Sequence, residues 1–122
     1  MRTLNTGDLK EVPLSISGRE FVLREMTMSR TYKLEELGEL STELGANLAA
    51  LAPEKTKERK SIRTSIRDID LQMYRILLIP VAPTEPPSDQ WLRENIGAGL
   101  LDKVIMPAQQ KLNNHEDVLG NE

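Results

Sequence analysis

The sequence contains no cysteine, a single histidine and only four aromatic residues among 122. Without cysteine the chain can form no disulfide, no thiolate nucleophile and no zinc–thiolate site. The few aromatic side chains predict an aliphatic core. No run approaches the roughly 18 consecutive apolar residues of a membrane-spanning helix, and the N-terminus has no apolar run typical of a signal peptide. We therefore expect a cytoplasmic protein that does not enter the membrane.

The overall charge of −3 is unfavourable for general binding to nucleic acid, which requires many cations to neutralise phosphates. One basic segment departs from this balance, and its cations are opposed only by Glu58. They are Lys55, Lys57, Arg59, Lys60, Arg63 and Arg67. Two interpretations stay open: a solvated linker and helix start, or a patch for an acidic partner segment. Nucleic acid is a weaker third choice, because no aromatic residue that could stack on bases lies between the cations.

A β-hairpin is predicted over residues 12–25. Val12, Leu14 and Ile16 alternate with less apolar residues, which is the period of a half-buried strand. Ser17-Gly18 supplies the turn, because glycine accepts the positive φ of tight hairpins. Pro13 cannot donate to a sheet ladder, so the first strand is expected at an edge.

Helices are predicted for most of the remaining chain. Leucines three or four residues apart indicate a helix over 28–52 that begins after Thr27, with glutamates between them facing water. Isoleucines at similar spacing indicate a helix over 61–79, buried on more than one side near its C-terminal end. A proline-rich connector is expected over 80–87, helices over 88–113 and a flexible tail over 114–122. The predicted fold is a single domain of the α+β class, mostly α, with the N-terminal β-hairpin packed on a small helical bundle.

The pattern of polar residues predicts no enzyme, no metal site and no cofactor. His115 lies among polar residues near the C-terminus, where no rigid pair of partners could hold it for catalysis. The glutamates of the first helix lack the Glu-x-x-His motif of carboxylate-bridged metal sites. Gly97-Ala98-Gly99 matches no phosphate-binding loop and indicates a joint between two helices.

Association with another polypeptide is the function that remains. The apolar helix faces are generous for a chain of this size, and unpaired apolar surface marks sites for partners or for self-association. Trp91 is either an interface anchor or a residue buried between the last helices. The residues that we expect to bind a partner are Leu37, Leu44, Leu48, Leu71, Tyr74, Trp91 and Leu101.

Two stretches resemble the tail assembly chaperones of long-tailed, siphovirus-like bacteriophages. The first is the hairpin from Val12 to Ser17 that continues through Gly18 into residues 21–28 and then a leucine-rich helix. The second is residues 88–95 followed by residues 100–113. The resemblance covers most of residues 12–114. It is one of layout and local sequence, because this family has no catalytic signature. The basic segment and the proline connector have no counterpart that we can map onto the family.

The resemblance implies a non-enzymatic helper made in the cytoplasm of the infected bacterium and absent from the finished particle. Such proteins coat the long tape-measure protein, keep it soluble and help to recruit tail-tube subunits. An amphipathic helix of the partner lying in a groove between apolar helix faces is compatible with this function. Two alternatives stay open. One is a structural component of the virion, such as a head–tail connector or minor tail protein. The other is a nucleic-acid-binding regulator that uses residues 55–67.

Overall fold

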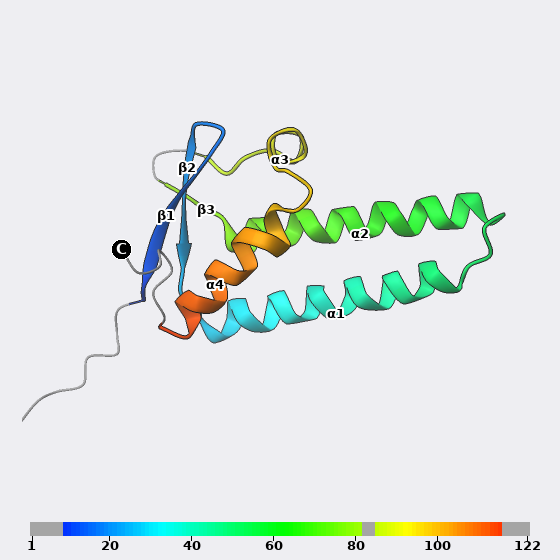
Figure 1. The fold of residues 1–122 in the computed structure, drawn as a ribbon, viewed down its shortest axis with the longest axis horizontal. Coiled ribbons are helices and arrows are strands. Elements are labelled where there is room, and N and C mark those ends of the chain that lie inside the picture. Colours follow the sequence, from blue (N-terminus) through cyan, green and yellow to red (C-terminus); the bar gives the residue numbers. More distant parts are fainter. Residues whose placement is uncertain (1–8, 82–84, 116–122) are drawn as a thin grey trace, which may run out of the picture. The chain divides into compact units, whose positions relative to one another are not determined.

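The computed structural model describes residues 9–81 and 85–115. They form two compact units. The sheet unit comprises Met1–Thr27 and Leu77–Glu122, and the hairpin unit comprises Met28–Ile76. The predicted α+β class, mostly α, is confirmed (Figure 1). Of the predicted tail over 114–122, only Asn114 and His115 lie within the described residues, where they form a turn.

The sheet unit is built on the predicted β-hairpin. β1 (Glu11–Ile16) pairs antiparallel with β2 (Arg19–Arg24), with Leu14 opposite Phe21 and Val12 opposite Leu23. Ser17 and Gly18 form the two-residue turn with φ of 48° and 81°. Both residues have left-handed backbone conformations, which are typical of the two-residue turn whose twist matches that of the strands. β1 is an edge strand, as Pro13 predicted.

A third strand replaces the start of the predicted proline connector. β3 (Ile79–Pro80) pairs antiparallel with β2, with Val22 opposite Ile79 and Phe21 opposite Pro80. The Val81 N–H donates to the Glu20 carbonyl at 3.2 Å. Because alternate residues of an antiparallel pair exchange hydrogen bonds, the neighbouring Pro80 lies at a position that donates none to β2. A proline is tolerated there because it lies on an edge strand and its missing N–H faces away from the ladder.

Helices cover one face of this sheet. α3 (Asp89–Asn95) begins as predicted after Ser88, whose hydroxyl accepts from the Trp91 N–H at 3.1 Å. A π-helical turn, η1 (Leu101–Ile105), runs directly into α4 (Met106–Asn113), and Pro107 lies in the first turn of α4. The buried apolar residues of the unit are Ile16, Phe21, Leu23, Leu77, Leu78, Leu92, Leu101, Ile105 and Leu112.

One buried amide joins α4 to the end of β2. Gln109 is 2% exposed, and its Nε2 donates to the Arg24 carbonyl at 2.8 Å and to Asn113 Oδ1 at 2.9 Å. The same Asn113 oxygen accepts from the Met26 N–H at 3.0 Å. Two backbone groups, one in the last residue of β2 and one two residues beyond it, therefore find partners on α4, which they need because they lose contact with water on folding.

The hairpin unit consists of two long helices joined by a short loop. α1 (Met28–Ala50) begins immediately after Thr27, as predicted. α2 (Thr56–Leu77) begins five residues before the predicted start at 61 and ends two residues before the predicted end at 79. The charged residues after Thr56 are good helix formers, and Glu58 in the first turn suits the positive helix end. The early end follows from Pro80, because a proline disfavours helical backbone in the residue before it.

Replacing Gln109 with alanine should lower the free energy of unfolding by about 1–3 kcal/mol, because the buried Arg24 carbonyl loses its donor. Chemical denaturation followed by circular dichroism measures this change. The matched control is Gln110→Ala, which alters the exposed neighbour on the same helix. The control should stay within about 0.5 kcal/mol of the unaltered protein. Equal stability of the two variants would show that the buried amide contributes nothing.

Candidate functional site: the helical hairpin

The distal part of the hairpin unit leaves its apolar stripe incompletely covered. The structure describes every residue from 38 to 68, and none of them is buried. The apolar residues that recur every three or four positions along each helix are only half-buried. They are Leu44, Leu48 and Leu51 of α1 and its following loop, and Ile62 and Ile66 of α2. Each helix has one neighbour in a two-helix hairpin, so the stripe stays open on its flanks.

Two arginines hold the helices of the hairpin together at its opposite ends. The Arg59 guanidinium, in the first turn of α2, donates to the carbonyls of Leu48 and Leu51 at 3.0 and 3.2 Å. Arg30, in the first turn of α1, donates to the Ile76 carbonyl at the end of α2. The last carbonyls of a helix have no partner within it and carry its negative dipole end. Each arginine therefore caps the helix that its own helix packs against.

This arrangement removes Arg59 from the predicted basic patch. The Arg59 side chain is half-buried and its guanidinium is hydrogen-bonded to the end of α1, so it is not available to an acidic partner. Sequence alone missed this role because Arg59 stands among cations of the same type. A signal was present, since Arg59 precedes Ile62 and Ile66 by three and seven residues and so shares their face. The remaining members of the patch are exposed: Lys55, Lys57, Lys60, Arg63 and Arg67.

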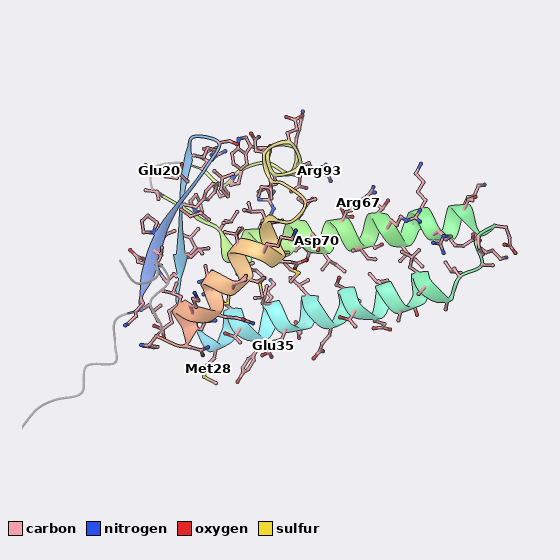
Figure 2. The ribbon with its side chains drawn as sticks, in the orientation of Figure 1. Glu20, Met28, Glu35, Arg67, Asp70 and Arg93 are labelled. Carbon is pink, nitrogen blue, oxygen red and sulfur yellow. The ribbon has the colours of Figure 1, made fainter. Side chains whose placement is uncertain are left out.

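Charges of opposite sign lie on the two helices of the hairpin. The exposed glutamates of α1 are Glu35, Glu36, Glu39 and Glu43. The exposed cations of α2 lie mostly in its first half, and Figure 2 shows Arg67 projecting from α2 on the side away from α1. Repulsion between like charges, and attraction to opposite ones, will therefore influence which polypeptide can lie along either helix.

The predicted partner-binding residues divide by burial. Leu37, Leu71 and Tyr74 of the hairpin unit are buried, as is Leu101 of the sheet unit, so none of these four is presented at the surface of the chain. Leu44 and Leu48 are half-buried on the open part of the stripe. Burial of Leu71 and Tyr74 on a different side of α2 from Ile69 agrees with the prediction that this end is buried on more than one side.

Trp91 has partners inside its own unit. Its ring lies 5.9 Å from the Phe21 ring between centroids, and the Arg19 guanidinium lies 5.1 Å from the centroid of the indole. Arg19 also donates to the Glu85 carbonyl. These contacts fix α3 and the preceding segment against β2, and a half-buried cation over an indole is favourable by about 0.5–1 kcal/mol. Trp91 is thus half-buried against β2, whereas one of the two roles predicted for it placed it between the last helices.

Other candidate chemistry is sparse in the part of the chain that the structure describes. His115 Nε2 lies 3.1 Å from Glu25 Oε2 at the surface. No group of three or more side chains among the described residues could hold a metal ion, and no described helix is both long and apolar enough to cross a bilayer.

Comparison with known proteins leaves the family open. No protein-family model matches the chain, and no curated protein or solved structure matches it either.

Replacing Arg59 with alanine should lower the free energy of unfolding by about 1–2 kcal/mol, because two hydrogen bonds from a cation to helix-end carbonyls are lost. Hydrogen exchange at the last turn of α1 should accelerate along with this loss. Lys60→Ala is the matched control, since it removes the neighbouring exposed cation. An Arg59→Ala protein whose exchange in α1 is unchanged would contradict the capping role.

Proposed function

We propose that this protein is a non-enzymatic assembly chaperone of a long-tailed bacteriophage, acting in the host cytoplasm on the tape-measure protein. In this proposal an amphipathic helix of the tape-measure protein lies along the open stripe of the α1–α2 hairpin. The tail-tube protein is the second partner, recruited to the coated tape measure. No reaction and no cofactor are assigned to the chain.

The observation that carries the proposal is the half-covered stripe. Leu44, Leu48 and Leu51 on one side of the helical hairpin, and Ile62 and Ile66 on the other, are all only half-buried, and the hairpin unit has no third element to cover them. Burying the remainder of such side chains is favourable by about 25 cal/mol per Å² of apolar surface. An incoming helix with apolar residues three and four apart would complete a three-helix core.

The surface of the hairpin also suits a reversible function. A chaperone has to release its client when the tube assembles, so its contact cannot be as extensive as a permanent core. Here the contact surface is a narrow stripe that already has part of its area covered, and it is bordered by charged residues on both helices. Rim charges of this kind influence the association rate and the choice of partner more than the affinity.

The test is co-purification with helical fragments of the tape-measure protein from the same phage. The double variant Leu44→Glu and Leu48→Glu places two charges in the stripe, and it should reduce fragment binding by at least about 100-fold. The matched control, Ala46→Glu with Ala49→Glu, places the same charges on exposed positions of the same two turns. Circular dichroism verifies that both variants keep their helices.

Retention of binding in the control and its loss in the stripe variant would support the proposal. Absence of binding by the unaltered chain, even at low salt, would count against it. A chain found in purified virions at fixed stoichiometry would instead indicate a structural component of the particle.

A further inference from the structure

An apolar groove lies in the sheet unit, outside the surface to which the proposed function refers. It has a volume of about 330 Å³ and lies between β1 and the continuous helix formed by η1 and α4. Its lining on the sheet side includes Val12, Leu14 and Leu23, and on the helix side Val104, Pro107 and Ala108. A groove of this size accommodates a few side chains of an extended segment.

The groove exists because the helices cover β2 better than β1. Phe21 and Leu23 of β2 are buried, whereas Val12 and Leu14, which lie opposite them on β1, are only half-buried. Across the groove Val104 is 48% exposed. It belongs to the π-helical turn, and such turns are frequent at functional sites. Apolar side chains therefore face the opening from both walls.

Two lysines make the groove electropositive. Lys103 and Lys111 both line it, and neither ammonium has a carboxylate partner among residues 9–81 and 85–115. Their Cα atoms are eight residues apart on one continuous helical segment, which separates them by roughly 12 Å along the axis. The Lys103 side chain extends from there toward Gly99. The nearest acidic residue of β1, Glu11, is already engaged by Arg24 at 3.0 Å.

The outer edge of β1 offers backbone groups beside the same groove. Ile16 and Arg19 close the hairpin, and the Glu25 N–H donates to the Lys10 carbonyl at 2.7 Å. By the alternation of an antiparallel pair, Glu11, Pro13 and Ser15 direct their backbone groups away from β2. Pro13 interrupts this row of donors, so side chains in the groove have to supply most of the affinity.

We propose that this groove binds an extended, acidic and aliphatic segment of a partner protein. In an extended chain, residues i, i+2 and i+4 face the same side, and four residues span about 13 Å. Acidic residues at i and i+4 thus match the spacing of Lys103 and Lys111 along the helix, and the long Lys103 side chain turns from Gly99 to reach its carboxylate. An aliphatic residue at i+2 enters the groove near Val104 and Ala108. This groove shares no residue with the α1–α2 helical hairpin, and the proposal does not depend on the function proposed for that hairpin.

The probe is a fluorescein-labelled peptide, acetyl-Ser-Glu-Ser-Leu-Ser-Glu-Ser-amide, titrated with the full chain and followed by fluorescence anisotropy. We expect a dissociation constant below about 1 mM. The double variant Lys103→Glu and Lys111→Glu should weaken this binding by roughly tenfold or more, since two attractions become repulsions. The same variant should gain affinity for a peptide with lysine in place of both glutamates.

The matched control is Lys33→Glu with Asn47→Glu and Gln72→Glu, which makes the same change of net charge on exposed residues of α1 and α2 outside the basic segment. It should bind the acidic peptide as the unaltered chain does. Equal weakening in both variants would show that only the net charge of the chain matters, and this would overturn the proposal. Absence of binding by the unaltered chain would overturn it as well. A chain ending at His115 that binds the peptide tenfold more tightly would assign the groove to residues 116–122 of this chain instead. None of these outcomes bears on the binding of tape-measure fragments to the α1–α2 helical hairpin, which is tested separately.

Discussion

A helix that packs against only one other helix cannot hide its whole apolar stripe, and this constraint dominates the hairpin unit. The leucines of α1 and the isoleucines of α2 each follow one stripe of their helix, yet every residue from 38 to 68 keeps contact with solvent. A third layer usually resolves the problem in compact domains. The hairpin unit does not contain that layer within its own chain segment, which makes its surface suited to an incoming helix.

In the sheet unit, polar side chains of α4 supply hydrogen bonds to backbone groups at the end of β2, which apolar side chains could not do. The strand β2 ends at Arg24, and the backbone beyond it still needs hydrogen-bond partners. Gln109 and Asn113 provide them from α4, at the cost of placing an amide in an apolar face. The Gln109 Oε1 atom is buried without a hydrogen-bond partner in the structure. Specific placement of the helix on the sheet thus depends on a costly polar contact as well as on apolar packing.

Patterns of period two and of three to four residues were sufficient for the main elements. The β-hairpin, its Ser17-Gly18 turn and the starts of α1 and α3 all follow from local chemistry. β3 could not be predicted, because two residues containing a proline carry no strand pattern, and only the long-range pairing with Val22 and Phe21 defines them. The buried Gln109 left one signal: it continues the spacing of Leu101 and Ile105 toward Leu112. Core and surface leucines share that spacing, so it could not separate buried Leu37 from half-buried Leu44.

The reciprocal placement of Arg30 and Arg59 makes the start of each helix and the neighbouring end of the other helix interdependent. Each guanidinium lies in the first turn of one helix and satisfies the last carbonyls of the other. Fraying at either helix start therefore withdraws the donor from the opposing helix terminus, and that terminus loosens in turn. Helix ends ordinarily melt one at a time, whereas here the melting of neighbouring ends is coupled. The loop between Leu51 and Lys55 consequently unfolds together with the last turn of α1 and the first turn of α2, which it joins.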